Sequence, residues 1–253
     1  MSNESGIEWT EQTWNPMTGC TKVSPGCKHC YAETMAKRLK AMGAPGYERG
    51  FKLSLHPERL HQPLQRRKPT TYFVNSMSDL FHKEVPDAYL DRIVDVIDAT
   101  PQHTYQVLTK RAERLPEYFG RRECPPNMWL GVSVENRKHG LPRIELLRKV
   151  KAKIRFLSVE PLLEDLGILD LSDIHWVIVG GESGPKARPM KLEWAESVLQ
   201  QARQAGAAAF MKQVGTWPIG PDGERLRTST RKGGAMNDWP LSLRLREMPS
   251  VLP

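Results

Sequence analysis

The chain has 253 residues and a formal net charge of +8, from 37 Lys and Arg against 29 Asp and Glu. Hydrophobic residues make up 39% and charged residues 26%, which excludes a disordered or fibrous chain. There is no signal-like N-terminus and no long apolar run, so the sequence predicts a cytoplasmic protein without a membrane partner. The positive charge favours a polyanion partner, although a basic enzyme without one fits equally well.

The first predicted strand lies near Thr13 to Met17 and leads into a loop with three of the four cysteines, Cys20, Cys27 and Cys30. Thiolates are soft ligands that suit iron–sulfur clusters and zinc, and the glycines and proline of this loop let the three sulfurs approach one another. Three thiols would leave one corner of a four-iron cluster free for a small molecule. Such clustering favours a metal site in a reducing compartment over a disulfide scaffold.

A closed zinc site is the alternative for this loop, with His29 or Cys124 as the fourth ligand. Against it, His29 lies between two of the cysteines, where reaching the same metal would strain the chain. Cys124 has no neighbouring cysteine or histidine. Cys124 is a candidate catalytic residue, as a hydrogen donor or redox partner, and its alternative role is that of an ordinary loop cysteine.

A helix is predicted to follow the cysteines and to end before Gly43. Its expected apolar stripe consists of Tyr31, Met35, Leu39 and Met42. We expect this helix to brace the loop.

Short apolar runs recur from Thr71 onward, and each is typical of a buried strand. The runs start at Thr71, Tyr105, Met128, Ile154, Trp176 and Ala208, about one βα unit apart. Apolar residues at helical spacing predict helices through Leu90–Ile97 and Leu192–Ala202, the second capped by Gly206. The predicted fold is therefore α/β, a partial (β/α)6 TIM-like barrel. An open doubly wound sheet is the alternative, although no Gly-x-Gly-x-x-Gly motif follows a strand.

Two stretches depart from this repeat. Residues 43–69 are dense in Gly, Pro, Arg and His and are expected to form a loop-rich insertion. We predict one barrel over residues 1–216, carrying the cysteine loop, and a C-terminal extension over 217–253 that packs on the barrel. A lid or a nucleic-acid contact is the alternative role of the extension.

The cysteine loop and the strand pattern together resemble the radical S-adenosylmethionine (radical SAM) superfamily. Its signature is three cysteines after the first strand of a partial (β/α)6 barrel, followed by an aromatic residue. Cys20, Cys27, Cys30 and Tyr31 match those roles. The segments WTEQTWNPMTGC, SMSDLFH, LTKR, SVEP, GGESG and KGGAMNDWP are similar to a phage- and bacteria-encoded three-cysteine branch. Six residues separate the first two cysteines where the superfamily usually has three, and we expect the longer loop to add a turn.

The resemblance implies a [4Fe-4S] cluster on the three cysteines, with S-adenosylmethionine bound to the remaining iron. An external electron donor such as flavodoxin or ferredoxin would reduce the cluster. The resulting 5′-deoxyadenosyl radical would abstract hydrogen from a substrate. The superfamily usually carries Gly-Gly-Glu after the second strand, and Asn75, Ser78 and Asp79 are the predicted substitutes here. Gly180 and Glu182 belong to a later motif that is similar to the superfamily's glycine motif beside the adenine.

Active sites of barrels gather at the carboxyl ends of the strands, where this sequence places several polar residues. The further candidates for cofactor binding are Ser133, Glu135, Asn136 and Glu160. Lys110, Arg111, Lys212 and Gln213 also follow apolar runs. The alternative for any single one is a solvated or capping side chain.

Basic clusters and seven tryptophans favour a nucleic-acid substrate, held by phosphate attraction and base stacking. The clusters are Arg66–Lys68, Lys110–Arg111, Arg121–Arg122, Lys149–Lys153 and Arg225–Lys232. DNA repair, such as thymine repair, or base modification would suit radical chemistry. The alternatives are a non-catalytic zinc-binding nucleic-acid-binding protein and a radical enzyme acting on a small metabolite or peptide.

Overall fold

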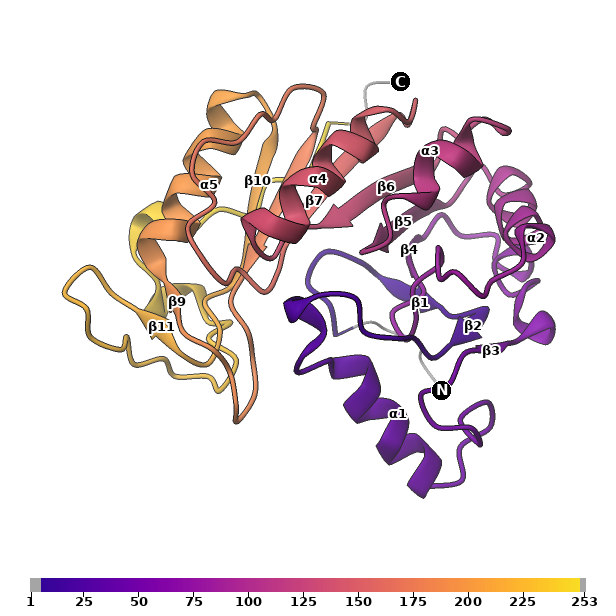
Figure 1. Cartoon of the computed structure of the whole chain (residues 1–253), viewed down its shortest axis with the longest axis horizontal. Coiled ribbons are helices and arrows are strands. Elements are labelled where there is room, and N and C mark those ends of the chain that lie inside the picture. The colour runs from indigo at the N-terminus through magenta and orange to yellow at the C-terminus, as the bar shows by residue number, and fades with distance from the viewer. Residues whose placement is uncertain (1–5, 251–253) are drawn as a thin grey trace. The chain divides into compact units, whose positions relative to one another are not determined.

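A computed structural model describes residues 6–250 of the chain and has a mixed α/β fold (Figure 1). Its main sheet has seven strands. Their order is β1 (Gln12–Trp14), β4 (Thr71–Val74), β5 (Thr104–Thr109), β6 (Met128–Ser133), β7 (Ile154–Val159), β8 (Trp176–Gly180) and β10 (Ala208–Gln213). The pairs β1–β4, β4–β5, β7–β8 and β8–β10 are parallel. The α/β class and all six later strands are confirmed.

The strand order rises along the sheet without reversal. A doubly wound sheet changes direction at a switch point, so this alternative is wrong. The order fits a partial TIM-like barrel.

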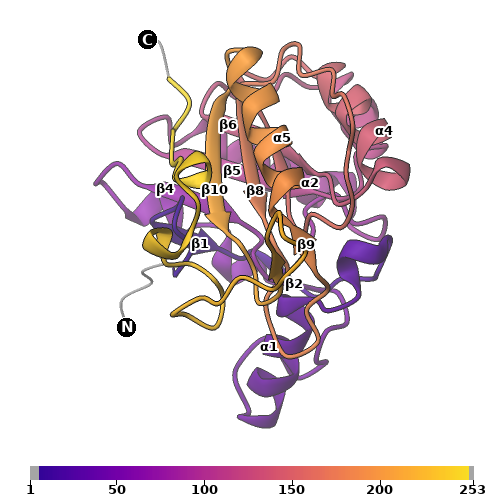
Figure 2. The same ribbon diagram turned by 90° about the vertical axis from the view of Figure 1, so that its left-hand side faces the viewer.

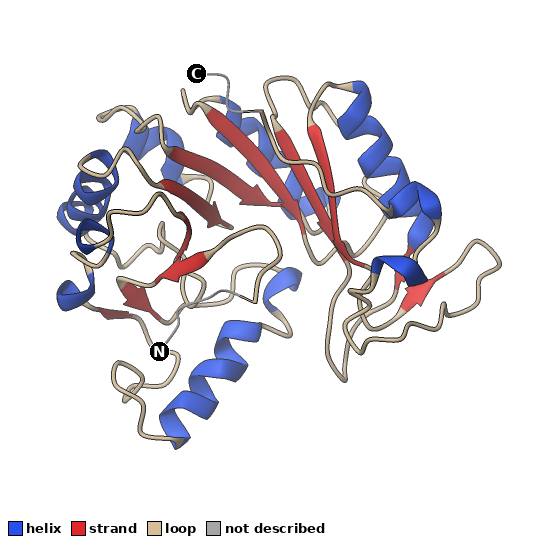
Figure 3. Cartoon of the chain, turned by 180° about the vertical axis from the view of Figure 1, so that it is seen from behind, coloured by secondary structure: helices blue, strands red, loops and turns tan. Residues whose placement is uncertain are grey.

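Five helices accompany the strands in the described residues (Figure 3). They are α1 (Tyr31–Ala41), α2 (Asp87–Asp98), α3 (Arg114–Phe119), α4 (Arg137–Arg148) and α5 (Leu192–Gln204). The connection from β7 to β8, described throughout, has no α-helix, so the regular alternation of six βα units is not complete there. None of the helices within residues 6–250 has the length and apolar character needed to cross a membrane.

The chain divides into two compact units. The first comprises residues up to Gly131 together with Lys149–Lys153, and the second comprises Val132–Arg148 and residues from Ile154 on. In the first unit, β2 (Met17–Thr18) pairs antiparallel with β3 (Ser54–Leu55). In the second, β9 (Met190–Lys191) pairs parallel with β11 (Pro218–Ile219).

The core of the first unit forms where α2 packs its apolar face inward. Leu90, Ile93, Val94 and Ile97, the predicted helical face, are all buried. Complete burial of each such side chain contributes about 1.5–3 kcal/mol. Pro86 immediately precedes the helix, and its fixed backbone suits a helix start.

Helix α1 differs from the prediction in the face that it buries. Tyr31 and Met42, expected in the apolar stripe, are 65% and 77% exposed. Ala32 and Ala36 point inward instead and pack with Met77, with Met35 and Leu39 half-buried beside them. Small side chains allow the helix to approach its neighbours closely, which the larger Tyr31 and Met42 would prevent.

The core of the second unit centres on β8, all five residues of which are buried, and on α5, which packs on β8 and β10 (Figure 2). Helix α5 buries the predicted residues Leu192, Ala195, Leu199 and Ala202, and Gly206 follows it at a φ of +76°. The segment after Trp217 belongs to this unit. Its Trp239 and Leu243 side chains are buried, and the Leu245 carbonyl accepts a hydrogen bond from the Met211 N–H at 2.8 Å.

Candidate functional site

The cysteine loop, residues 19–30, connects β2 to α1 and is pinned at its start. A Cβ atom on Gly19 would lie 2.2 Å from the Lys52 carbonyl oxygen, and the φ of Gly19 is +84°, so only glycine fits. The Gly19 N–H donates to the Met77 carbonyl at 3.0 Å, and the Cys20 N–H donates to the Phe51 carbonyl at 3.1 Å. These bonds fix the backbone of the first cysteine.

The remainder of the loop contains the extra turn expected from its length. Pro25–Cys27 forms a 3-10 turn, in which the Cys27 N–H donates to the Ser24 carbonyl at 3.0 Å. Cys30 is the N-cap residue of α1, with extended backbone angles. The second and third cysteines therefore lie on either side of the short connection into the helix.

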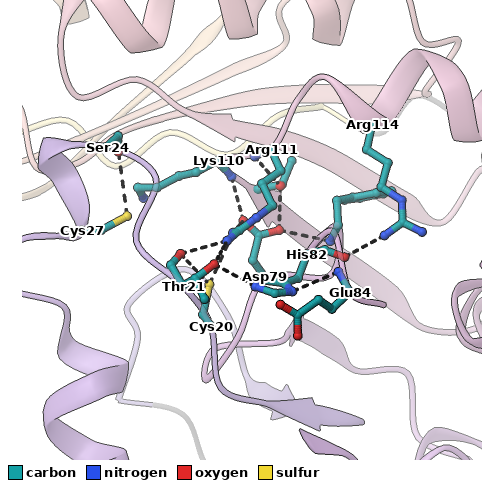
Figure 4. Close-up of polar contacts among 12 residues, drawn as sticks. Cys20, Thr21, Ser24, Cys27, Asp79, His82, Glu84, Lys110, Arg111 and Arg114 are labelled. Carbon is teal, nitrogen blue, oxygen red and sulfur yellow. Dashed lines mark hydrogen bonds and ion pairs between the residues drawn. The ribbon is translucent and has the colours of Figure 1, made fainter. Parts of the chain in front are cut away.

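Arg111, two residues after the end of β5, binds the first cysteine and the residue after it through its guanidinium (Figure 4). Its guanidinium donates to the Cys20 Sγ at 3.3 Å and to the Asp79 carboxylate at 3.0 Å. It also donates to the Thr21 carbonyl at 2.8 Å and to the Thr21 Oγ1 at 2.9 Å. Arg111 and Asp79 are 8% and 6% exposed, so these bonds are shielded from water.

Asp79 orients this guanidinium through a full set of hydrogen bonds. Its Oδ1 accepts from the Phe81 N–H at 3.1 Å and from the Thr109 hydroxyl at 2.7 Å. Its Oδ2 accepts from the Lys110 N–H at 3.0 Å and from Arg111. The carboxylate thus ties the chain after β4 to the end of β5 and fixes the direction of the arginine.

His82 completes the network around Thr21. Its Nε2 lies 2.9 Å from the Thr21 Oγ1, and its Nδ1 accepts from the Glu84 N–H at 3.3 Å. Burial, with Arg111 nearby, lowers the pKa of His82, so the ring is neutral at neutral pH and carries its proton on Nε2. The ring then donates to the Thr21 hydroxyl.

The electrostatics of the loop favour the protonated thiol at its first cysteine in the absence of a metal. Burial raises the pKa of Cys20 to about 11, Asp79 and Cys27 add to the rise, and Arg111 opposes it. Because metals bind the thiolate, loading a metal here releases a proton. Arg111 then provides a positive charge directly beside the thiolate.

The donor set of the loop fits an iron–sulfur cluster. The three thiols are free and half-buried. The hydrogen bond that Lys22 donates to Glu33 raises the pKa of Lys22, and the nearby side chains of Cys30 and Cys27 act in the same direction. Cys20, Cys27 and Cys30 are thus three soft ligands on one partly exposed loop.

No three His, Cys, Asp or Glu side chains within residues 6–250 form a group that could hold a metal ion. The cysteines, His29 and Cys124 accordingly do not meet at one point. The thiolates of a four-iron cluster bind different irons, and they need not meet in that way.

A family model described as "Protein of unknown function (DUF5131)" matches residues 4–239. The chain belongs to this family. No curated protein matches it.

Solved structures of spore photoproduct lyase show a distant likeness. A mutant with bound AdoMet and dinucleoside spore photoproduct has 16% identity and a TM-score of 0.46, covering 71% of this chain and 58% of that chain. Another mutant has 15% identity and a TM-score of 0.47, covering 79% and 63%. This chain therefore spans less than two thirds of the length of those lyase chains. A likeness at this level says nothing about activity.

The three residues predicted to replace the Gly-Gly-Glu motif have different surroundings. Asp79 is committed to the Arg111 network, and the Ser78 hydroxyl donates to the Met17 carbonyl at 3.0 Å. Asn75 follows β4 at a φ of +61° and is 4% exposed. Neither its Nδ2 nor its Oδ1 has a hydrogen-bond partner. A buried amide without partners has hydrogen-bonding capacity for a ligand.

The candidates of the second unit are held in charge pairs and caps. Glu135 accepts from Arg143 at 2.7 Å, and the same guanidinium donates to the Ser133 carbonyl at 2.9 Å. The Asn136 Oδ1 accepts from the His139 N–H at 3.0 Å, which makes Asn136 a cap of α4.

Glu160, which follows β7, forms a second pair with Lys212 at 2.9 Å and accepts from Gln213 at 3.3 Å. A Cβ atom on Gly180 would lie 3.2 Å from the Glu160 carboxyl carbon, so the glycine leaves room for this side chain. Glu182 accepts two hydrogen bonds from the Arg188 side chain, at 2.6 and 2.9 Å. The structure brings Glu160, Gly180, Lys212 and Gln213 together.

Cys124 and Tyr31 lie in contrasting settings within the first unit. The Cys124 Sγ contacts the carbonyl oxygens of Met128 and Pro125 at 3.8 and 3.9 Å. Burial raises the pKa of Cys124 to about 12, which keeps the thiol protonated. Tyr31 begins α1 with an exposed ring.

Sequence reasoning missed Thr21, His82 and Thr109, and noted Arg111 only as one polar residue among several. The Arg111–Thr21 bonds join residues 90 positions apart. No local pattern signals such a pairing. The one available signal was a cation two residues after the last residue of β5.

Proposed function

We propose that this chain is a radical SAM enzyme that holds a [4Fe-4S] cluster on Cys20, Cys27 and Cys30. The observation that carries the proposal is one loop with three free, half-buried thiols, the first of which is held by Arg111 at the carboxyl end of β5. Active sites of barrel-type folds gather at that end of the strands.

Arg111 has the central positioning role in this proposal. Its hydrogen bond to the Cys20 sulfur stabilises the thiolate charge, and hydrogen bonds to ligand sulfurs tune the reduction potential of a cluster. Asp79 orients the guanidinium. The hydrogen bond from Arg111 to the Thr21 carbonyl fixes the loop residue that follows Cys20. Gly19 allows the start of the loop to pack closely against the Lys52 carbonyl.

With S-adenosylmethionine bound, such a cluster supplies a radical that removes hydrogen from a substrate. Asn75 is the residue of the first unit that we assign to cofactor binding, because its buried amide can both donate and accept. The other predicted cofactor contacts stay proposals; they are Tyr31, Ser78, Asp79, Ser133, Glu135, Asn136, Glu160, Gly180 and Glu182. An external flavodoxin or ferredoxin would deliver the electron.

A nucleic-acid base is the proposed substrate. The net charge of +8 supports this class, since a basic surface attracts polyanions. Repair or modification of a base requires the base to leave its stack before chemistry.

Anaerobic reconstitution with iron and sulfide tests the cluster. The wild-type chain should turn brown and retain about four irons, whereas a C20A/C27A/C30A variant should retain almost none. Cys124→Ala is the matched control and should retain the wild-type iron content. A colourless zinc protein, or equal iron in the triple variant, would overturn the assignment of the ligands.

The enzymatic part has a separate test. Loaded protein should form 5′-deoxyadenosine when S-adenosylmethionine and dithionite are added, and a nucleic-acid substrate should increase its formation. A loaded cluster that gives no product with single strands, duplexes or damaged DNA would contradict the activity while leaving the metal site intact.

A further inference from the structure

The second unit contains a hollow of about 440 Å³ lined by residues of β9, α5 and β11 and of the segments next to them. Figure 1 shows these elements in orange and yellow. Two indole side chains line it, Trp194 from the first turn of α5 and Trp217 from the segment before β11. Arg188, Lys191 and Ile219 are also among its walls. We call it the tryptophan hollow.

Trp217 is 48% exposed although it is a large apolar side chain. Its backbone is fixed, because its carbonyl accepts from the Met190 N–H at 3.0 Å and the next residue begins β11. Most tryptophans in folded proteins are largely buried, so a half-exposed indole on a hydrogen-bonded backbone at the edge of a hollow indicates a contact surface.

Each indole of the hollow has a cation over its ring. The Arg225 guanidinium lies 5.4 Å from the centroid of Trp217 and is held by a hydrogen bond to the Thr216 carbonyl at 2.8 Å. The Lys191 Nζ lies 5.8 Å from the centroid of Trp194. Aromatic faces and positive charges are thereby combined in one small area.

The chain segments that build the hollow are basic. Residues 186–194 and 217–232 contain seven Lys and Arg against three Asp and Glu. Arg188 and Lys191 pair with Glu182 and Glu193, at 2.6 and 3.4 Å, whereas Arg225 donates to a backbone carbonyl and keeps its charge available beside Trp217. The charge of the rim is therefore complementary to a polyanion.

We propose that the tryptophan hollow binds an unpaired nucleotide of a nucleic-acid strand. The base stacks on Trp217 while Arg225 and Lys191 contact the neighbouring phosphates. This proposal rests on the nucleic-acid substrate of the proposed function and assigns that substrate a binding site. Binding at the hollow does not require a cluster. A neutral proline-rich peptide would also suit exposed indoles, but it gives the surrounding cations no role.

Fluorescence anisotropy on cluster-free protein tests the proposal, with labelled oligo(dT), oligo(U) and a duplex as probes. Single strands should bind more tightly than the duplex, and affinity should fall steeply as salt rises. Trp217→Ala should weaken binding roughly tenfold or more, and Trp217→Phe, which keeps a ring, should restore most of it. The deoxy and ribo probes distinguish DNA from RNA, and tight binding of either supports the proposal.

Two matched controls separate the hollow from general effects. Ile168→Ala removes a 96% exposed apolar side chain of the same unit and should leave binding unchanged. Arg225→Gln should reduce the slope of log affinity against log salt by about 0.7, the value for one phosphate contact on a single strand. Arg203→Gln, on the exposed side of α5, should change the slope less.

Equal affinity in wild type and Trp217→Ala, with both variants folded by circular dichroism, would overturn the proposal. So would binding that is independent of salt, or a duplex that binds as tightly as the single strands. None of these outcomes alters the iron content, so failure of the hollow and failure of the cluster assignment are distinguishable.

Discussion

The two units use buried charge at their strand ends in different ways. In the first unit the Asp79–Arg111 pair reaches beyond itself, since the guanidinium also holds the Cys20 sulfur and the Thr21 backbone. In the second unit the side chains of Glu135 and Arg143 are 0% and 5% exposed, and the arginine donates to Glu135 and to the Ser133 carbonyl, both in its own strand–helix connection. The first arrangement secures a functional loop, whereas the second secures the core.

This difference matters because a buried ion pair contributes little net stability and becomes costly only when one partner is lost. A buried ion pair whose bonds stay within the core fixes how a strand and a helix pack together. A pair that also donates to a half-exposed sulfur adds control over that sulfur. Removing one partner of each ion pair tests this difference between the two units.

The largest loss of stability is expected in the second unit. Glu135→Ala leaves the Arg143 guanidinium buried without its carboxylate and should lower the free energy of unfolding by about 3–5 kcal/mol. Urea unfolding measures this change. A double E135L/R143M variant should recover most of the loss, because no buried charge remains. A loss below about 1 kcal/mol in the single variant would contradict the role given to this pair.

A smaller loss of stability but a larger loss of metal retention is expected in the first unit. Arg111→Met leaves Asp79 with three other donors, so unfolding should become easier by only about 1–3 kcal/mol. Reconstituted protein should nevertheless lose iron to a chelator several times faster. The Lys110→Met variant, which removes a positive charge from the neighbouring residue, should lose iron at the wild-type rate. Equal rates in both variants would show that the Arg111–Cys20 bond does not support the cluster.

Mild acid should affect the first unit more than the second. Burial lowers the pKa of His56 and His82 in the first unit, and that of His175 in the second. A lowered histidine pKa means that the unfolded chain takes up protons first, so stability is complete above about pH 6.5 and declines below it. Hydrogen exchange at about pH 7 and about pH 5.5 should show amide protection in β4 and β5 falling more than in β8 and β10. The reverse order would contradict this assignment.

The strands could be predicted because each buried strand is a continuous apolar run. The expected starts agree with β4, β6, β7, β8 and β10, and β5 begins one residue earlier than expected. Helices α2 and α5 could be predicted from their apolar periodicity and from the flanking residues Pro86 and Gly206. Helix α4 does not, because Gly140 and Pro142 interrupt its pattern.

The site was predictable only where it is local in sequence. Three cysteines within eleven residues identify the loop, but the groups that hold it come from the ends of β4 and β5. Asp79 illustrates the limit. Its position after a strand predicts a cofactor contact, which stays a prediction, while its hydrogen bond to Arg111, 32 residues away, has no local signal in the sequence.

Cys30 is the N-cap residue of α1, so any negative charge that the cysteine loop gains on binding a cofactor lies beside the start of this helix. The partial positive charge of a helix N-terminus favours an anionic group beside it. Helix α1 buries only Ala32 and Ala36 completely enough to count as core, so packing alone gives it a weak hold. Loading of an anionic cofactor on the cysteine loop would consequently stabilise the first turn of this helix.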